Sequence, residues 1–585
     1  MNMLHAFIST IDPRRCLRCG LTGLILCSTG LFAAEPTIEF NGVSGELQTN
    51  LQAALSLTAE PCTAPAWRIK RLFRRSDQEL DGAARALGYY QLKVKKDLQL
   101  KLDCWQADFT IEPGQPVTLQ TVDIDINGEA HDDPLFIQLL KETPVRSGGQ
   151  LHHGHYNSLK GKIETLAAER GYFDGQFTTR ELKVDPAAGQ ASIKLHYHAG
   201  SRYRIGTLVL EQDTYAPELL ERYLKIKAGD HYDANALQAL HQALSGSGYF
   251  QDVVVKQDFQ AASNGVINVR VQLVPRKGTA YRLGVGVATD TGPRFSASYE
   301  KRRVNRYGHR FESKLILSQA DSSLGLEYSI PTQQPHIDQV SLRGSYQQLE
   351  TDTSSSDITA LGLRALGTRN GWSETRYLDW VSENSVIGSD KTAAYLLVPG
   401  ISWSRTHADN RMHPRKGSRM SVEARGASEA LLSDASFIQL LAGGKWIEPL
   451  GEGRVLIRAD SGLSITPDLT KIPASYRFFA GGDQSVRGYG YQTLGPRNMA
   501  NQVTGARYLL SGSLEYEHPI VGDWSAALFV DAGSAFDDWN DSLKYSVGVG
   551  LRWRSPVGPI RLDFAIPNDT RKDAFRIHFS MGGDL

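Results

Sequence analysis

The C-terminal half of the chain alternates apolar and polar residues with a period of two, beginning near Tyr281. Val340 and Leu342 are separated by a serine, and Met420 and Val422 are separated by another. This period is typical of β-strands that bury one face. Because the second face stays polar throughout and includes arginine, the pattern favours a wet interior over the packed core of a sandwich.

A chain with such strands has few ways to cross a membrane. Beyond the N-terminal leader the sequence contains no run of 18 apolar residues, which is about the length that a spanning helix needs. A closed barrel is the other backbone arrangement that satisfies its hydrogen bonds in lipid. We therefore predict an all-β transmembrane barrel over residues 278–585. At roughly 19 residues per strand and connection, about 16 antiparallel strands fit, and 14 or 18 are not excluded.

The N-terminus has the features of an export signal. Three arginines precede a short apolar run, and two small residues follow it: Arg14, Arg15, Arg18, Gly20–Phe32, Ala33 and Ala34. We therefore expect residues 1–34 to be a signal peptide that is removed. A lipoprotein site at Cys27 is the alternative, but Leu26 is bulky where such a site needs a small residue.

Two cysteines, Cys62 and Cys104, remain in the mature chain. Export leads to oxidising compartments, where paired cysteines form disulfides. We therefore predict a Cys62–Cys104 disulfide, with two buried free thiols as the alternative.

The first half of the chain contains a threefold repeat. A glycine followed by two aromatic residues recurs about every 80 residues, as Gly88-Tyr89-Tyr90, Gly171-Tyr172-Phe173 and Gly248-Tyr249-Phe250. Apolar residues at helical spacing precede each glycine, and an alternating strand-like stretch opens each unit. We expect each glycine to end a helix in the left-handed conformation. Ser76 with Glu79, and Asp233, are candidate helix N-caps.

Each unit is therefore predicted to be α+β, in the order strand, helices, strand, strand. The three predicted domains cover residues 35–116, 117–200 and 201–277. This unit resembles the POTRA domain of outer-membrane assembly factors. The resemblance implies that such domains bind client or partner chains by strand addition to an exposed sheet edge, which offers unpaired backbone groups.

The most specific motif is Asp483 to Tyr489, which contains an Arg-Gly-Tyr triplet. It resembles the long-loop motif of the POTRA-plus-barrel superfamily, whose inner-wall motif Phe-x-Asp-x-Gly is also present. The resemblance implies that the loop folds into the lumen and that Arg487 pairs with Asp531, as a guanidinium in a confined site requires. The predicted lumen brace consists of Arg487, Gly488, Tyr489, Phe529, Asp531 and Gly533.

The last and first barrel strands are expected to meet at a seam. The chain ends on an amphipathic stretch, and glycines, which weaken strands, lie in both strands. The predicted seam residues are Gly284, Gly286, Phe579, Gly582 and Gly583. Ordinary barrel glycines explain these residues equally well, and the superfamily resemblance favours a seam that opens sideways.

Three repeats with this barrel most resemble the TamA family, the outer-membrane subunits of the translocation and assembly module. The resemblance implies a bacterial outer-membrane location with periplasmic N-terminal domains. It also implies insertion of autotransporters and other β-barrel proteins, and an inner-membrane-anchored TamB-like partner. The expected partners are thus the TamB-like protein, client outer-membrane proteins and the lipid bilayer. A two-partner-type secretion pore, passing polypeptide through the lumen, is the alternative.

The sequence contains no motif for catalysis or for a cofactor. Nucleophile-elbow, phosphate-loop and zinc-protease motifs are absent, so we expect no enzyme, no cofactor and no metal. A short cluster, His152, His153 and His155, is interpreted as solvated. With 64 basic and 64 acidic residues, the charge gives no indication of nucleic-acid binding.

Overall fold

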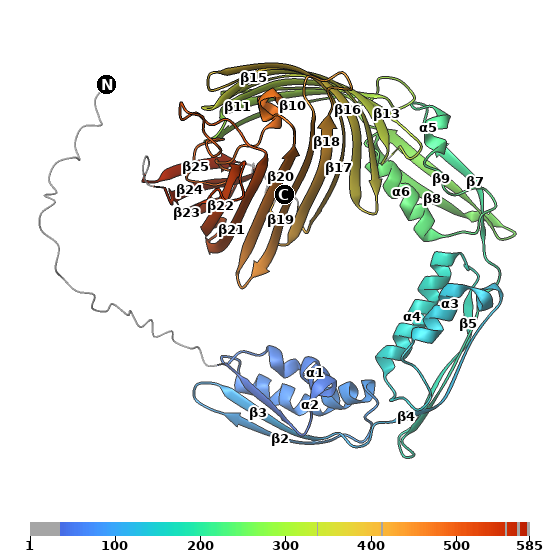
Figure 1. The fold of residues 1–585 in the computed structure, drawn as a ribbon. Coiled ribbons are helices and arrows are strands. Elements are labelled where there is room, and N and C mark those ends of the chain that lie inside the picture. Colours follow the sequence, from blue (N-terminus) through green and yellow to red (C-terminus); the bar gives the residue numbers. More distant parts are fainter. Residues whose placement is uncertain (1–34, 336, 411–412, 556–557, 570–573, 582–585) are drawn as a thin grey trace, which may run out of the picture. The chain divides into compact units, whose positions relative to one another are not determined.

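The computed structural model of the protein describes residues 35–335, 337–410, 413–555, 558–569 and 574–581. The predicted signal peptide lies outside the described residues, and so do Gly582 and Gly583 of the predicted seam. The chain divides into two compact units: the first two α+β domains form one, and the third domain and the barrel form the other (Figure 1).

The first domain packs two helices on a three-stranded sheet of order β1-β3-β2, in which β1 is parallel to β3 and β2 antiparallel. Leu51, Leu80 and Phe109 are fully buried between the helices and the sheet. The elements are β1 (Thr37–Asn41), α1 (Gly45–Ala54), η1 (Ser56–Ala59), α2 (Ala66–Ala86), β2 (Lys93–Leu100) and β3 (Trp105–Glu112).

The second domain has the same topology, with sheet order β4-β6-β5. Phe136, Ile163 and Leu195 lie in its core. Its elements are β4 (Thr118–Asn127), η2 (Glu129–Asp132), α3 (Pro134–Glu142), α4 (His153–Arg170), β5 (Gln176–Asp185) and β6 (Gln190–His198).

The third domain repeats the topology once more, with order β7-β9-β8. Its elements are β7 (Arg204–Glu211), α5 (Pro217–Glu221), α6 (Ala234–Gly246), β8 (Phe250–Ser263) and β9 (Val266–Pro275). Gly88, Gly171 and Gly248 each follow a helix with φ of 86°, 88° and 75°. This is the left-handed conformation expected at a helix end, so the threefold α+β repeat is confirmed.

One predicted helix cap is wrong and another is right. Ser76 lies inside α2, which begins ten residues earlier at Ala66, and its hydroxyl donates to the Phe73 carbonyl. The helix extends further because its apolar face continues upstream through Ile69. Asp233 does cap α6, since its carboxylate accepts hydrogen bonds from the first-turn amides.

A disulfide joins Cys62 and Cys104 in the first domain, with the two Cα atoms 4.5 Å apart. It links the segment before α2 to the turn before β3. The bond therefore closes a loop that contains the longest helix of the domain.

The barrel is a sheet of 16 antiparallel strands in sequence order, and the predicted fold class is confirmed (Figure 1). Outward-facing positions such as Leu342 and Val549 are apolar and exposed. The described residues include no helix long and apolar enough to span a membrane. The strands are β10 (Thr279–Ala288), β11 (Gly292–Lys301), β12 (Arg310–Ser318), β13 (Asp321–Pro331), β14 (Gln339–Glu350), β15 (Ser354–Arg369), β16 (Trp372–Ile387), β17 (Asp390–Ala408), β18 (Gly417–Ala427), β19 (Phe437–Leu450), β20 (Gly453–Ile465), β21 (Tyr508–Val521), β22 (Trp524–Phe536), β23 (Lys544–Ser555), β24 (Gly558–Pro567) and β25 (Arg576–Met581).

The third repeat motif attaches its domain to the barrel. The Tyr249 hydroxyl donates to the Gly308 carbonyl in the β11–β12 connection at 2.8 Å. The Arg310 guanidinium lies over the Tyr249 ring, 4.3 Å from its centroid, and donates to the Ser247 carbonyl. Burial raises the pKa of Tyr249, so its hydroxyl keeps the proton that it donates.

Candidate functional site

The inner wall of the barrel carries the acidic part of the site. Ser513 and Glu515 of β21 lie opposite Asp531 and Phe529 of β22 in the strand register. Their neighbours Leu514, Leu528 and Val530 are exposed on the outer face. The alternation of the strands therefore turns hydroxyl, carboxylate and aromatic side chains into the lumen.

A long connection between β20 and β21 supplies the basic part. It contains the short helices η3 (Leu469–Lys471) and η4 (Ala474–Tyr476). Apolar residues of this loop pack against the wall residue Ala535 in a buried cluster: Phe478, Ala480, Val486, Leu494 and Ala506. Because this cluster fixes the loop on both sides of the Arg-Gly-Tyr triplet, the triplet is held inside the barrel.

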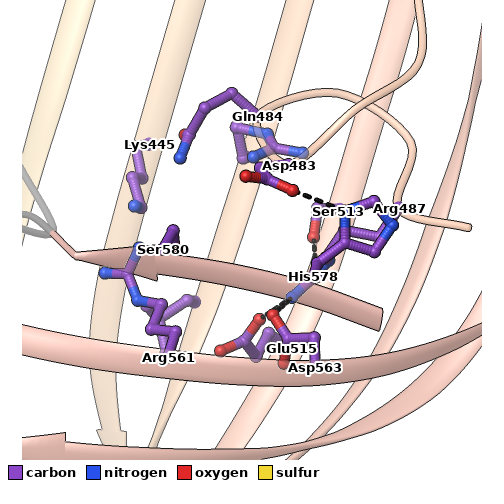
Figure 2. A pocket seen from close by; sticks show the side chains of 12 residues that line it. Lys445, Asp483, Gln484, Arg487, Ser513, Glu515, Arg561, Asp563, His578 and Ser580 are labelled. Carbon is purple, nitrogen blue, oxygen red and sulfur yellow. Dashed lines mark hydrogen bonds and ion pairs between the residues drawn. The ribbon is translucent and has the colours of Figure 1, made fainter. Parts of the chain in front are cut away.

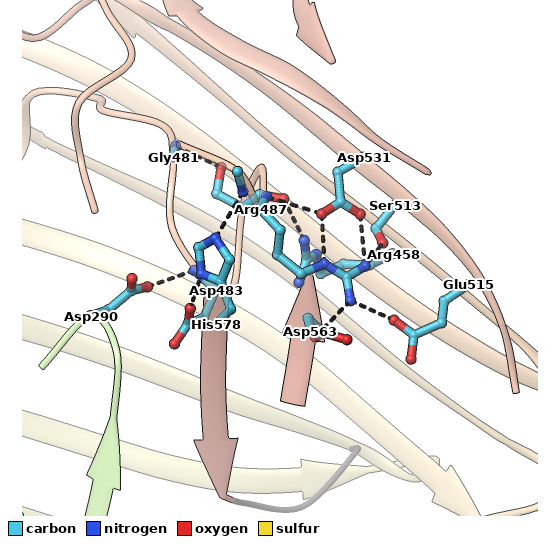
Figure 3. Close-up of polar contacts among 12 residues, drawn as sticks. Asp290, Arg458, Gly481, Asp483, Arg487, Ser513, Glu515, Asp531, Asp563 and His578 are labelled. Atoms are coloured by element: carbon cyan, nitrogen blue, oxygen red, sulfur yellow. Dashed lines mark hydrogen bonds and ion pairs between the residues drawn. The ribbon is translucent and has the colours of Figure 1, made fainter. Parts of the chain in front are cut away.

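Arg487 is the centre of the site, and Figure 3 shows its contacts. Its Nε and Nη2 donate to the two oxygens of Asp531 at 2.7 and 2.8 Å, and its backbone N–H donates to the same carboxylate at 3.0 Å. Arg487 is 5% exposed and Asp531 is fully buried. The structure thus brings the two predicted partners together in a two-pronged, desolvated pair.

Further partners of Arg487 were missed by the sequence analysis. Nη1 donates to Glu515 at 2.7 Å and to Asp563 of β24 at 3.2 Å, while Nη2 donates to Ser513 at 3.1 Å. Phe529, which the sequence analysis did place in the brace, lies under the guanidinium, with its ring centroid 3.4 Å from the guanidinium carbon. The polar face of β21 and β24 was visible in the sequence, but which of its residues reach Arg487 depends on the register.

The other predicted brace residues lie beside this pair. Gly488 has φ of 91° and its N–H donates to His578 Nε2 at 2.8 Å, and the Tyr489 hydroxyl donates to Asn568 at 2.7 Å. Gly533 permits close approach of β21, because a Cβ there would lie 2.6 Å from the Leu510 carbonyl oxygen.

A second guanidinium shares two of these carboxylates. Arg552 of β23 contacts Glu515 at 2.7 Å and Asp563 at 2.6 Å. The remaining cavity beside Arg487 measures about 40 Å³ and is lined on its far side by Lys445, Arg561 and Ser580 (Figure 2). This volume holds about one or two water molecules, so side chains fill this part of the lumen.

The seam lies where the two ends of the barrel sheet meet. In the described residues, Thr289 N donates to the Phe579 carbonyl at 3.0 Å, and Phe579 N donates to Thr289 Oγ1 at 2.7 Å. A Cβ on Gly286 would lie 3.8 Å from Met581, whereas Gly284 makes room for Ser296 of β11. Phe579 and Gly286 are thus at the seam, and the space at Gly284 serves the neighbouring strand.

The interpretation of the histidine cluster as solvated is wrong for two of its members. His153 is half-buried and hydrogen-bonded to the Tyr90 hydroxyl at 2.7 Å, and His152 contacts Glu46 at 3.2 Å. Both partners belong to the first domain, so packing of the first two domains partly shields these side chains from solvent. Burial, and secondarily His152, lowers the pKa of His153.

Comparison with known families agrees with this architecture. The model of the Omp85 superfamily domain matches residues 276–585. The chain belongs to the Omp85 superfamily. Two further family models match the domains that precede this Omp85 barrel: POTRA domain TamA domain 1 at residues 37–113, and the POTRA model described as surface antigen variable number repeat at residues 203–276. The first match supports the resemblance to TamA.

Two curated Omp85 relatives are named BamA and not TamA. Outer membrane protein assembly factor BamA from Neisseria meningitidis serogroup B is 22% identical over 570 residues, covering 85% of this chain and 70% of that protein. BamA from Nitratidesulfovibrio vulgaris is 30% identical over 199 residues, which is 32% of this chain and 25% of that protein. The matched region therefore spans between a quarter and about seven tenths of these relatives.

A solved Omp85 structure shares the fold. The crystal structure of BamA from Haemophilus ducreyi lacking POTRA domains 1-3 aligns with a TM-score of 0.64 and 15% identity, covering 80% of this chain and 99% of that chain. Membership of the superfamily confirms the outer-membrane location with periplasmic POTRA domains, and the expectation that the chain is not an enzyme. Because β10 follows the third POTRA domain, the β10–β11 turn lies at the end that faces the cell exterior.

Proposed function

We propose that this Omp85 protein inserts autotransporters and other β-barrel proteins into the outer membrane through the seam between β10 and β25, working with an inner-membrane-anchored TamB-like partner. The curated relatives are named as outer-membrane protein assembly factors, and the TamA-type first domain favours the translocation and assembly module.

The observation that carries the proposal is the short contact across the seam. The described part of β25 spans Arg576–Met581, whereas β10 spans Thr279–Ala288, and no ladder joins them. Leu283 and Val285 of β10 are 77% and 79% exposed. A strand edge with free donors and acceptors is a template for another strand, so a client strand can pair there as it enters the membrane.

The loop anchored inside the barrel argues against passage of polypeptide through the lumen. The loop that carries Arg487 crosses the interior and is held by Asp531, Glu515 and Asp563. A secretion pore would require this buried ion cluster to break, which costs several kcal/mol when charges lose partners, about 3–5 for a buried pair. The lateral route leaves the cluster intact.

A seam lock tests the proposal. We expect cysteines replacing Gly286 and Met581 to form a disulfide across β10 and β25, since the Met581 Cε lies 3.8 Å from the Cβ position of residue 286. We expect the locked protein to lose client insertion in reconstituted vesicles and to regain it on reduction. The matched control places cysteines at Leu342 and Leu363, which are paired in β14 and β15, and should insert clients in both redox states.

Two results would contradict the lateral route. Undiminished client insertion with a fully formed seam disulfide would exclude it. Continued release of client polypeptide through the locked barrel would instead support the secretion pore. The disulfide Cys62–Cys104 is present in both variants, so the control also shows any effect of reducing it.

The partner is expected at the edges of the periplasmic sheets. β2, β5 and β8 are edge strands of the three sheets, and they can accept an added strand. Cross-linking in intact envelopes from photoreactive residues at Lys95 in β2 should capture a large inner-membrane-anchored protein. Capture of soluble secreted polypeptide instead would favour the secretion reading.

A further inference from the structure

Three segments that are distant in the sequence meet at the outward-facing end of the seam. Asp290 lies in the turn after the first barrel strand, Asp483 in the lumen loop and His578 in the last strand. One ligand-type atom from each lies within 4.8 Å of the others, and Figure 3 shows the group. The cluster therefore connects both sides of the seam to the loop.

The hydrogen bonds within the cluster use half of its carboxylate oxygens. Asp483 N donates to Asp290 Oδ2 at 2.6 Å, and His578 Nδ1 contacts Asp483 Oδ1. His578 Nε2 accepts from the Gly488 N–H. Because Nε2 is the acceptor, the neutral ring carries its proton on Nδ1 and donates it to Asp483.

The other two carboxylate oxygens have no partner. Asp290 Oδ1 and Asp483 Oδ2 are buried and receive no hydrogen bond from any residue that the structure describes. The Asp483 side chain is only 7% exposed. In the neighbouring brace, by contrast, both oxygens of Asp531 accept hydrogen bonds. Arg576 lies near Asp290 but forms no ion pair with it among the described residues. Two adjacent buried carboxylates are costly without a direct positive partner, so the site favours a bound cation.

We propose that Asp290 and Asp483 bind a hard divalent cation, Ca²⁺ or Mg²⁺, which closes the outer end of the seam. Each carboxylate supplies its free oxygen, and water completes the coordination, as is usual for these ions. The cation ties the first turn to the loop, and the loop is tied to β25 by the hydrogen bonds of His578.

The hydrogen bonds of His578 select the class of ion. Zn²⁺ prefers an imidazole nitrogen, but Nε2 faces the Gly488 N–H and Nδ1 carries the proton. Binding a metal at Nδ1 would move that proton to Nε2, opposite another donor. His578 is therefore a positioning residue for Asp483, and oxygen ligands define the site.

Two carboxylates give a weak site. Sites with few charged ligands in extracellular modules have Kd of about 10⁻⁴–10⁻³ M. At roughly ten times Kd, mass action shifts the equilibrium toward the closed seam about 10-fold. The site is thus expected to respond to the millimolar range of divalent cations.

The test measures cation binding and seam closure separately. Ca²⁺ and Mg²⁺ are titrated calorimetrically into the full-length protein in detergent after chelation, with Zn²⁺ as a third arm. We expect about one Ca²⁺ or Mg²⁺ per chain, a loss of affinity of at least 10-fold in Asp290→Asn and in Asp483→Asn, and no loss in Asp352→Asn. Asp352 is an exposed acidic residue in the β14–β15 connection and is the matched control.

The second measurement follows the rate of disulfide formation in the Gly286→Cys/Met581→Cys protein. We expect this rate to be about 10-fold higher in saturating Ca²⁺ than in chelator, and to be insensitive to Ca²⁺ when Asp483→Asn is added.

Equal cation affinity in Asp290→Asn and Asp352→Asn would overturn the site. Zn²⁺ binding alone, abolished by His578→Gln, would overturn the ion class. A closure rate that follows pH and ignores cations would mean that the carboxylates share a proton instead. Because binding is measured without clients, a failed insertion assay leaves this result unaffected.

Discussion

The lumen brace and the seam are held in opposite ways, although one loop contributes to both. Around Arg487, four side chains from three strands accept hydrogen bonds from one guanidinium, and the three carboxylates among them are buried. Across the seam, the hydrogen bonds between the described residues of the two barrel ends all join Thr289 to Phe579. Thr289 N and Oγ1 donate to the Phe579 carbonyl, and Phe579 N donates to Thr289 Oγ1.

This difference indicates that, near the seam, contacts of the loop stabilise the barrel more than strand pairing does. Strand pairing normally closes a barrel through a continuous ladder. Here the loop, fixed to the wall by its ion cluster, reaches Asp290 on one side of the seam and His578 on the other. Opening of the seam, which the proposed function requires, would break the contacts of Thr289 and Asp290 and would leave the ion cluster at Arg487 in place.

The largest effect is expected from Arg487→Ala, which removes the centre of the brace. Three buried carboxylates would lose their shared partner, and breaking such a contact costs about 3–5 kcal/mol. We expect a lower urea midpoint of the full-length barrel, followed by its gel mobility, with assembly in the membrane retained. Arg376→Ala is the control, since the Arg376 side chain is 69% exposed. Equal midpoints for the two variants would show that the brace contributes no stability.

An intermediate effect is expected from Gly482→Ala, which disturbs the link from the loop to the seam. Gly482 has φ of 105°, and a Cβ there would lie 2.5 Å from Asp290 Oδ2. Backbone strain of this kind costs about 1–3 kcal/mol, so the loop should move off the turn and slow the cysteine lock between β10 and β25.

The control for this strain is Gly522→Ala. Gly522 has φ of 54° in a hairpin turn, and nothing lies within 4 Å of its Cβ position. It carries a backbone penalty without the clash. If both variants slow the lock equally, the contact between the loop and Asp290 does not hold the seam.

The smallest effect is expected from Thr289→Val, which deletes the hydroxyl that accepts from Phe579 N. Loss of one such hydrogen bond costs about 1 kcal/mol, so the rate of the cysteine lock should fall about 5-fold. Thr291→Val, in the same turn, should leave the rate unchanged. A fall in the control as large as in Thr289→Val would assign the effect to the turn as a whole.

The sequence predicted some of the site because part of its chemistry is local. The Arg-Gly-Tyr and Phe-x-Asp-x-Gly motifs identified Arg487 and Asp531 through a family resemblance, and the structure joins them. Alternation identifies Glu515 and Asp563 as residues that face the lumen. It does not say at which height along the barrel axis they lie. Their height follows from the strand register, and a shift of register moves every side chain.

The misread histidines show the same limit. The sequence suggested that His153 lies before a helix and is exposed, yet it begins α4 and hydrogen-bonds to Tyr90 of the preceding domain. Nothing local to His153 encodes that neighbour. Similarly, Asp290, Asp483 and His578 occur in three unrelated segments, so no spacing rule could have grouped them.

By itself, the sequence determined the three α+β repeats, the glycines that end their helices, and the long series of alternating strands, because periodicity and backbone preference act over a few residues. The tertiary structure decided that β10 and β25 meet over a short contact, that three carboxylates surround Arg487, and that Asp290 and Asp483 come together at the seam. These features depend on pairings between segments up to about 290 residues apart, which are set by register and closure of the whole sheet.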